Sequence, residues 1–491
     1  MSDSTHCLAL DFGASSIRLI GVGLVDGHLE LSEFARIAHG PHEEDGRLIW
    51  DYPVIYRQIE HALAIAGASG RSFHSIGAAS WGVDYVLLDE KGQRIGHPVS
   101  YRDGRTDGQV ERFTSRHIGA ASLFATTGLP ALWFNTLYQL YAQTQSEPEL
   151  LRRAHRLLFT ADYAHFWLGG KPVNEITLAS TSQMLTLDGA WWDEALAPLA
   201  LPDSALSPVV PAGSILGEFA PELGRKTNLC GVQVIAPCAH DTQSAILAVP
   251  ATEGTDWAYL SSGTWSILGA ESPVPCYDAA AEIAGLGNEQ GYGGTYCVQS
   301  TVTGLWLIQE IQRLLGRSAA RQLADEAARS LAFRSLVDPA DPRFFHPANM
   351  IAEIQAACGE AGEPVPVTVG ELARCAYDSL ALLYRQRLRV LSEVTGRRFA
   401  RLHVVGGGSQ AMLLNQLSAA VTGIPVLAGP AEATAIGIAL AQLIALGALS
   451  SVREARRLVR VSQPPTVIEP LPITGLDDAV ARFDRIATLK R

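Results

Sequence analysis

The chain has 491 residues, of which 47% are hydrophobic and 18% are charged, and its formal net charge is −12. This length favours two domains, and the apolar content argues against extended disorder. The acidic balance argues against nucleic acid and against an anionic membrane as partners, because both bind basic surfaces.

The predicted elements mix strands with helices, which indicates an α/β fold. In chain order, the hydrophobic pattern predicts a strand, tight turn and strand at residues 7–25, a helix at 51–68, strands with alternating burial at 75–89, and a second strand, turn and strand at 258–269. The two turns, FGASSI and SGTWSI, share Gly, a small residue, Ser and Ile, and lie about half a chain apart. An internal duplication, with one turn per domain, is therefore weighed against a chance similarity over a short stretch.

The later segments predict a strand, three glycines and a helix at residues 401–423, then a helix, a Pro-rich extended stretch and a final amphipathic helix. The stretch at 247–257 contains Pro and Gly and is expected to cross between domains. The predicted division is an N-terminal domain at 1–247, a C-terminal domain at 248–450 and a tail at 451–491.

Seven cysteines are scattered along the chain without a C-x-x-C pair, which is typical of a reduced, cytoplasmic protein. Cys358 and Cys375 fall on two helix-like segments that can approach each other, although buried free thiols are the simpler interpretation. The polar N-terminus runs directly into a strand pattern, so no signal peptide is expected. The apolar run at 433–449 lacks basic flanks and predicts a buried helix rather than a membrane span.

The sequence has no G-x-x-x-x-G-K-[ST] loop, and no G-x-G-x-x-G follows its first strand. Phosphates, if bound, would be held by backbone N–H groups of the two glycine turns, with Ser15, Ser16 or Thr264 as hydroxyl donors. Asp11 would then lie where the hydration shell of Mg²⁺ can use a carboxylate. Ordinary turns, with an Asp that bonds local backbone, are the competing interpretation. The glycines at 406–408 can likewise admit a purine ring or a phosphate, or form a plain connection.

The stretch VIAPCAHDTQSA (234–245) ends an apolar run and places His240 and Asp241 before a predicted helix. A carboxylate at such a junction can accept a proton from a hydroxyl nucleophile, although Asp241 can also act as the N-cap of the helix. In SWGVDYVLL, strand alternation predicts Trp81, Val83 and Tyr85 on one face and Gly82 and Asp84 on the other. Gly82 would let a ligand lie against the backbone while Asp84 bonds its hydroxyls, unless Asp84 is a solvated edge residue.

A series of motifs in this order carries a resemblance: LDFGASS, ASWGVDYVLLD, YRDGRT, FNTLYQL, the Asp162–Tyr163 pair, AHDTQSA, YLSSGTWS, TGLWLIQE, VVGGGSQAMLLNQL and GPAEATAIG. The chain resembles the FGGY carbohydrate kinases over nearly its whole length, and within them most closely the kinases that act on L-rhamnulose. The resemblance implies two actin/Hsp70-like (ribonuclease-H-like) domains that flank a catalytic cleft. It also implies ATP-dependent phosphorylation of the C1 hydroxyl of a ketose, with Mg²⁺.

Together, the motifs and the resemblance assign the candidate site residues. Asp241 would be the catalytic base, and Asp11 would reach Mg²⁺ through water. ATP would bind at Gly13, Ala14, Ser15, Ser16, Ile17, Arg18, Gly263, Thr264, Gln309, Gly406 and Gly407. The ketose would bind at Trp81, Gly82, Asp84, His240, Asp241, Thr242 and Thr301.

Three departures from the family pattern bear on the substrate. Thr301 and Ile438 stand where the L-rhamnulose kinases usually have Asn, and Ile17 stands where Gly is common. A different donor set at residue 301 can favour another ketose, such as L-fuculose or a pentulose. A non-catalytic regulator that binds sugar and nucleotide is the alternative from another class, and it is disfavoured because Asp11 and Asp241 are both present. The oligomeric state is left open between monomer and homodimer.

Overall fold

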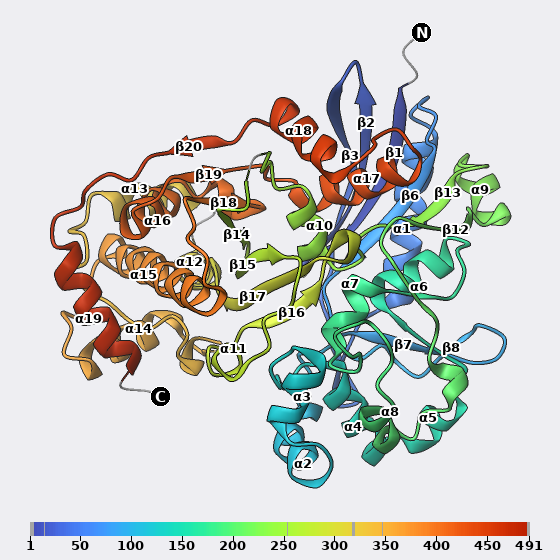
Figure 1. Cartoon of the computed structure of the whole chain (residues 1–491), viewed down its shortest axis with the longest axis horizontal. Helices are drawn as coiled ribbons and strands as arrows, with labels where there is room; N and C mark the ends of the chain where they lie inside the picture. The colour runs from blue at the N-terminus through green and yellow to red at the C-terminus, as the bar shows by residue number, and fades with distance from the viewer. Residues whose placement is uncertain (1–3, 14, 253, 317–319, 346, 489–491) are drawn as a thin grey trace. The chain divides into compact units, whose positions relative to one another are not determined.

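The computed structural model describes residues 4–13, 15–252, 254–316, 320–345 and 347–488 (Figure 1). The chain forms two compact units. Unit 1 comprises Met1–Thr252, Glu271–Val298 and Ala433–Gln463, and unit 2 comprises Glu253–Ala270, Gln299–Glu432 and Pro464–Arg491. The described part of the chain contains no helix with both the length and the hydropathy that a membrane span requires.

Unit 1 is built on a six-stranded sheet with the order β12-β13-β6-β1-β2-β3. Its strands are β1 (Thr5–Phe12), β2 (Ser16–Val25), β3 (His28–Ala38), β6 (Ser75–Ser80), β12 (Ser214–Glu218) and β13 (Gln233–Ala236). The strands β1, β6 and β13 run parallel, while β1 and β2 form the predicted antiparallel hairpin. Residues 7–12 of β1 and all of β6 are buried, as expected for parallel strands that are covered on both faces.

The helices of unit 1 come from distant parts of the chain. They are α1 (Tyr52–Gly67), α2 (Gln109–Arg116), α3 (Ala120–Thr127), α4 (Thr136–Ser146), α5 (Pro148–Arg153), α6 (Thr160–Trp167), α7 (Ile176–Ala179), α8 (Asp193–Leu196), α9 (Pro221–Thr227), α10 (Asp241–Leu247), α11 (Ala279–Ile283), α17 (Ala433–Ala445) and α18 (Val452–Ser462). The apolar α17 packs against β1, β6 and α10, which confirms the predicted buried helix. The chain therefore returns to complete the core of unit 1 after it has built most of unit 2.

Shorter strands complete unit 1. A small sheet has the order β8-β7-β9, from β7 (Tyr85–Leu88), β8 (Arg94–Ile95) and β9 (Arg156–Phe159). The other strands are β4 (His42–Glu44), β5 (Arg47–Ile49), β10 (Asn174–Glu175), β11 (Val209–Val210) and β16 (Gly287–Gln290). The strands β6 and β7 are separated by a turn, so the stretch 75–89 is not one continuous strand.

Unit 2 repeats the strand plan of unit 1. Its strands follow the order β17-β15-β14-β18-β19-β20, from β14 (Trp257–Ser262), β15 (Trp265–Ser272), β17 (Tyr296–Thr303), β18 (Arg401–Val405), β19 (Val426–Ala428) and β20 (Thr466–Ile468). In both units an antiparallel hairpin continues into two parallel strands and then an antiparallel edge strand. This shared topology supports the predicted duplication. The predicted division of the chain into domains at residues 247 and 450 stays a prediction.

The helices of unit 2 are α12 (Trp306–Leu314), α13 (Ala320–Ala328), α14 (Met350–Glu360), α15 (Val369–Thr395), α16 (Met412–Thr422) and α19 (Leu476–Thr488). The helix α15 begins with a capping box between Thr368 and Glu371 and ends at Gly396, which has a φ of 65°. Cys358 of α14 and Cys375 of α15 are buried free thiols whose Sγ atoms lie 3.9 Å apart.

Candidate active site

The predicted residues of unit 1 lie at the carboxyl ends of three neighbouring parallel strands. Gly13 follows β1, Trp81 follows β6, and His240 comes shortly after β13. The register pairs Phe12 with Ser80, and Ser80 forms a parallel bridge with His240. Three loops that are far apart in the sequence therefore meet at one edge of the sheet, where α/β proteins usually bind ligands.

The hairpin between β1 and β2 places Asp11 directly opposite Arg18, and the two side chains form an ion pair. The N–H of Gly13 donates to the Ser16 carbonyl at 3.0 Å, and Ser15 is exposed. Ile17 is fully buried and lies between Phe12 of β1 and Ile37 of β3 in the sheet, so its predicted contact with ATP stays a prediction. Ala14 lies outside the described residues.

Trp81 and Asp84 contact each other, so the prediction that they point to opposite faces is wrong. The indole N–H groups of Trp50 and Trp81 both donate to Asp84 Oδ2 at 2.8 Å. The cause lies at Val83, whose φ of 71° reverses the chain between β6 and β7. A β-branched residue rarely adopts this conformation, and here two hydrogen bonds hold it: the Thr136 hydroxyl donates to the Val83 carbonyl at 2.7 Å, and the Val83 N–H donates to Thr181 Oγ1 at 3.2 Å.

Asp84 is buried, and it is not the solvated edge residue of the competing interpretation. Burial raises its pKa to about 6, although the Trp81 and Trp50 bonds, the Arg105 charge and the N–H of Tyr101 act to lower it. Its Oδ1 atom makes no hydrogen bond of normal geometry with the described residues. Thr181 packs where a side chain on Gly82 would lie, since a Cβ there would be 3.0 Å from Thr181 Oγ1, so Gly82 allows this close packing.

Asp241 is the first residue of α10, and His240 is its N-cap without a side-chain capping bond, so the capping interpretation of Asp241 is wrong. Its Oδ1 accepts a hydrogen bond from the Thr242 hydroxyl at 3.2 Å and lies 3.5 Å from His240 Nε2. The side chain is 28% exposed. Burial raises the pKa of Asp241, while the His240 charge and the Thr242 bonds oppose the rise. A partly exposed carboxylate of raised basicity suits a general base.

Glu289 of β16 is a part of this site that the sequence analysis missed. Its Oε2 atom lies 2.8 Å from His240 Nδ1 and accepts a hydrogen bond from Gln243 Nε2 at 2.9 Å. Burial opposes the charged form of His240, but Glu289 and Asp241 outweigh it and raise the pKa of His240 to about 9. His240 is therefore an imidazolium at neutral pH, held between two carboxylates.

A second missed residue, Glu175, fixes the backbone that leads to Asp241. Its Oε2 atom accepts hydrogen bonds from the N–H groups of Ala239 (2.9 Å) and Thr177 (3.0 Å) and from the Thr177 hydroxyl (2.5 Å). The Thr177 hydroxyl in turn accepts from the N–H of His240 at 3.2 Å. Glu175 is also the N-cap of α7, which is the signal that a sequence reading could have used.

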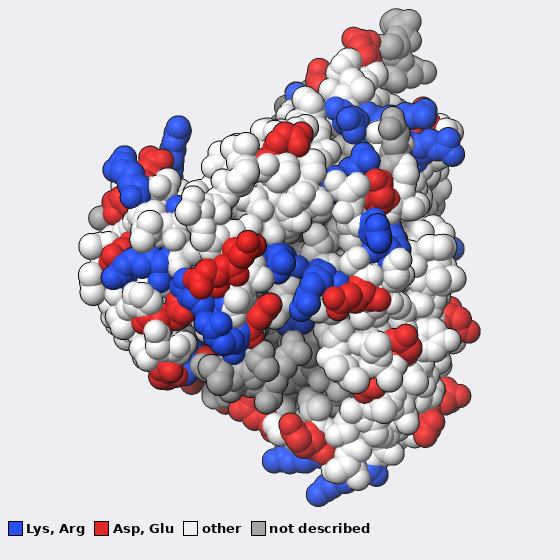
Figure 2. All heavy atoms as spheres, turned by 60° about the vertical axis from the view of Figure 1, so that its left-hand side comes forward, with Lys and Arg blue, Asp and Glu red and all other residues white. Residues whose placement is uncertain are grey.

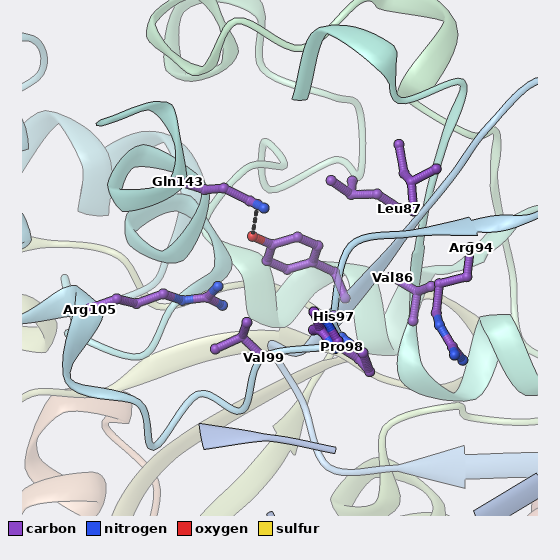
Figure 3. Close-up of a pocket in the computed structure, with 10 residues that line it drawn as sticks. Val86, Leu87, Arg94, His97, Pro98, Val99, Arg105 and Gln143 are labelled. Carbon is purple, nitrogen blue, oxygen red and sulfur yellow. Dashed lines mark hydrogen bonds between the residues drawn. The ribbon is translucent and has the colours of Figure 1, made fainter. Parts of the chain in front are cut away.

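A cavity behind β7 is too small to be the substrate site (Figure 3). Its volume is about 10 Å³, which is room for one water molecule. The Tyr85 hydroxyl beside it donates to Gln143 Oε1 at 2.6 Å, and the Arg105 guanidinium lies 5.8 Å from the centre of the Tyr85 ring. These contacts hold the strand that follows Asp84.

The predicted residues of unit 2 form a second cluster. Gly263 and Thr264 join β14 to β15, and their carbonyls accept hydrogen bonds from the N–H groups of Leu305 (2.9 Å) and Trp306 (3.2 Å) at the start of α12. A Cβ on Gly406 would lie 3.0 Å from the Ser262 carbonyl, so the glycine junction after β18 packs against the same hairpin. Gln309 of α12 and Thr301 of β17 are exposed. A short 3-10 turn (Gly407–Gln410) separates the glycines from α16.

Two family models match this chain, and together they cover most of it. The N-terminal domain of the FGGY family of carbohydrate kinases matches residues 6–248, and the C-terminal domain of that family matches residues 258–446. The chain belongs to the FGGY family of carbohydrate kinases. It is thus a sugar kinase that uses ATP, which confirms the predicted enzyme class.

Relatives and solved structures agree with this FGGY kinase assignment. The rhamnulokinase of Klebsiella pneumoniae (strain 342) is 41% identical over 97% of this chain and 96% of its own, and that of Yersinia pestis (strain Pestoides F) is 41% identical over 94% and 95%. The xylulose kinase of Lactobacillus acidophilus matches at a TM-score of 0.81 and 16% identity, over 99% of this chain and 98% of its own. The glycerol kinase of Plasmodium falciparum with ADP matches at 0.81 and 14%, with the same coverage. These structures confirm the predicted actin/Hsp70-like fold.

Proposed function

We propose that this FGGY kinase transfers the γ-phosphoryl group of ATP to the C1 hydroxyl of L-rhamnulose, forming L-rhamnulose 1-phosphate. The observation that carries the proposal is the 41% identity to rhamnulokinases over nearly the full length of both chains. On the face drawn in Figure 2, Lys and Arg are interspersed with Asp and Glu. A nucleic acid binds a basic surface, so this mixture of charges supports a small-molecule substrate instead. The seven cysteines, which are free thiols, support the cytoplasm as the location.

Asp241 is the base in this proposal. Phosphoryl transfer needs an aligned hydroxyl, compensated phosphate charge and little water, and a carboxylate near the hydroxyl removes its proton as the new bond forms. Asp241 is exposed enough to reach a ligand, and its Oδ1 accepts a hydrogen bond from the adjacent Thr242 hydroxyl. Glu175 holds the preceding backbone from below, so the carboxylate is aimed before the sugar arrives.

Trp81, Asp84 and His240 form the sugar-binding surface in this proposal. A buried carboxylate oxygen without a partner is costly, and a sugar hydroxyl that donates to Asp84 Oδ1 would remove that cost. The His240 imidazolium bonds Glu289 through Nδ1, and its Nε2–H lies 3.5 Å from Asp241 Oδ1, so a sugar hydroxyl next to Asp241 could also accept from this N–H. Hydroxyls are thus offered both acceptors and donors, as sugar recognition requires.

The residues present fit Mg²⁺ bound together with ATP. Among the described residues, no group of three or more His, Cys, Asp or Glu side chains is placed to hold a metal ion. Mg²⁺ typically keeps several waters and binds through one or two carboxylates plus phosphate oxygens. Asp11 would supply such a carboxylate through water, with Arg18 and the hairpin N–H groups beside the phosphates. The ion would supply compensation of the phosphate charge.

The test is ADP release with Mg-ATP against L-rhamnulose, L-fuculose, L-ribulose and D-xylulose, with a control that lacks sugar. We expect turnover to depend on sugar and L-rhamnulose to have the highest kcat/KM. Selection of another ketose would keep the kinase and replace the substrate. Equal ADP release with and without sugar would overturn the kinase reaction in favour of a regulator.

Thr301 gives a reason to test a second ketose, because it replaces the usual Asn and is exposed on β17. The variant Thr301→Asn should raise the kcat/KM for L-rhamnulose relative to the other three sugars, since Asn is longer and offers an amide with two N–H donors where Thr offers one O–H. The ratios of kcat/KM in the same panel check this. Unchanged ratios would show that residue 301 does not read the sugar.

A further inference from the structure

His39 contacts the hairpin of β1 and β2, which is called the phosphate hairpin below, on both sides of its turn. It follows the last residue of β3, and its backbone N–H donates to the Ser15 carbonyl at 3.2 Å. Its ring Nε2 lies 2.8 Å from the Gly13 carbonyl. A carbonyl only accepts hydrogen bonds, so the proton of the ring lies on Nε2. His39 therefore holds the hairpin from its backbone and from its side chain.

The other side of the His39 ring packs on the tryptophan pair. The ring stacks on Trp81 with centroids 5.6 Å apart and an interplanar angle of 24°, and it lies 5.4 Å from Trp50. The two indoles lie 4.5 Å from each other, and both bond Asp84 Oδ2. A continuous series of contacts thus runs from Asp84 through the tryptophans and His39 to Gly13.

A neutral imidazole suits this position for a physical reason. Its flat face stacks on an indole, while its edge donates to a carbonyl, and few side chains do both. Burial lowers the pKa of His39, and the Arg102 charge lowers it further, although the bond to Gly13 opposes them. The ring is therefore neutral near pH 7, so it keeps a single N–H that is committed to the hairpin.

We propose that His39 is a positioning residue that couples sugar binding to ATP binding. This inference rests on the proposed function, because it takes Trp81 and Asp84 as sugar contacts and the Gly13 hairpin as a phosphate contact. A sugar that bonds Asp84 and covers Trp81 fixes the tryptophan pair, and the stacked His39 ring then holds the Gly13 carbonyl in one position. Coupling is reciprocal, so sugar tightens nucleotide binding by the same factor by which nucleotide tightens sugar binding.

The experiment measures the Kd of a non-hydrolysable ATP analogue with Mg²⁺, by calorimetry on the full chain, with and without saturating ketose. We expect sugar to tighten nucleotide binding of the wild type by about 5-fold or more, the lower range of measured couplings. Two variants separate the two contacts. His39→Phe keeps the stack on Trp81 and removes the donor, and His39→Gln keeps a donor at the Nε position and removes the stack. Both should bring the ratio of the two Kd values close to 1.

The matched control is His61→Phe, which makes the same change at an exposed position of α1 and should keep the wild-type ratio. Thermal melts of all variants show whether they are folded. A purely structural role of His39 would lower stability or both affinities and leave the ratio unchanged. Wild-type ratios in both His39 variants, or a wild-type ratio of 1, would overturn the proposal.

Separate measurements show whether the assignment of L-rhamnulose as the sugar is wrong. Titration of each ketose alone, and the turnover panel, report whether L-rhamnulose is bound and phosphorylated. If another ketose is turned over, the Kd ratio is measured with that sugar, and this ratio then tests the role of His39. The two hypotheses therefore fail in different measurements.

Discussion

At the scale of single residues, Asp241 is positioned by hydrogen bonds to the backbone of the two residues before it, and not by bonds of its own carboxylate. Glu175 and Thr177 hold the backbone N–H groups of Ala239 and His240, and the carboxylate itself bonds the adjacent Thr242 and lies near His240. Its free side is thus available for a substrate proton. A base that is aimed by its backbone can be changed chemically without disturbing its position.

Replacing Asp241 by Asn tests the base. The amide keeps the size of the carboxylate and can still accept from Thr242, but it cannot take a proton. We expect kcat to fall by about 10² to 10⁴, with a smaller change in the KM for sugar. Steady-state ADP release measures both constants. Asp45→Asn, in an exposed turn where Asn is equally tolerated, is the control, and a near-normal kcat in folded Asp241→Asn would remove the assignment.

Glu175 predicts a pH dependence of stability. Burial raises its pKa from 4.5 to about 8, although its bonds to Thr177 and Ala239 act to lower it. The folded state therefore holds a proton that the unfolded chain has lost, so the stability from this group is full below pH 4.5 and is lost as the pH rises through 8. In Glu175→Gln, the free energy of unfolding should fall less steeply between pH 5 and 8.5 than in the wild type.

Urea unfolding at a series of pH values measures that slope. Asp162 Oδ1 accepts a hydrogen bond from the backbone N–H of Glu175, and burial raises the pKa of Asp162 as well. Because Asp162 also binds a proton in the folded state, a residual slope is expected in the variant. Glu222→Gln, at an exposed position of α9, should follow the wild-type curve. Parallel curves for wild type and Glu175→Gln would show that Glu175 does not bind the proton.

Adjacent residues could be predicted from the sequence, and contacts between distant segments could not. His240 and Asp241 are neighbours in the chain and stand out beside an apolar run. Glu289 and His39 reach the site from other segments, and no local pattern marks either of them. Trp81 and Asp84 were assigned to opposite faces because strand alternation ignores the positive φ of Val83.

At the scale of elements, the position of α10 depends on a glycine of another helix. A Cβ on Gly437 of α17 would lie 1.8 Å from the Ser244 carbonyl oxygen of α10. No side chain fits that space, so the two helices touch backbone to backbone. The sequence predicted α17 as a buried helix from its small apolar residues, but the partner helix could be found only in the folded structure.

The variant Gly437→Ala should push α10 away from α17. Overpacking costs about 1–3 kcal/mol, which exceeds the gain of up to about 1 kcal/mol from the better helix propensity of Ala. Because Asp241 begins α10, kcat should also fall. Urea unfolding and ADP release measure the two effects. Gly359→Ala is the control, since a Cβ there would meet only Val365 Cγ2 at 3.9 Å, and loss of neither stability nor activity in Gly437→Ala would contradict the packing argument.

At the scale of the whole molecule, an early and a late segment of the chain meet in unit 1. Gln442 of α17 accepts a hydrogen bond from the Ser75 hydroxyl at 2.7 Å and donates to the Leu8 carbonyl at 3.1 Å, across 434 positions of sequence. Two matching hairpins half a chain apart pointed to two domains. The return of α17 to unit 1 could not be predicted, because an apolar helix carries no sign of which sheet it will cover.

Gln442→Leu tests how much this return contributes. The change leaves the Ser75 hydroxyl and the Leu8 carbonyl buried without this partner, which costs about 1–3 kcal/mol. The urea midpoint should fall, with ADP release at low urea concentration much less affected. Gln58→Leu, on the exposed face of α1, should change stability by no more than about 0.5 kcal/mol. An unchanged midpoint in Gln442→Leu would show that the bonds add nothing.

The late position of α17 in the chain also sets an order of events during synthesis. The strands β1 and β6 leave the ribosome early, but the helix that packs on them is made only after residues 253–432, which hold most of unit 2. At roughly 5–20 residues per second, the ribosome needs on the order of ten seconds to make that intervening stretch. Throughout that interval, the part of the sheet on which α17 will pack is exposed in the nascent chain. We therefore expect this kinase to need chaperones more during its synthesis than after its release.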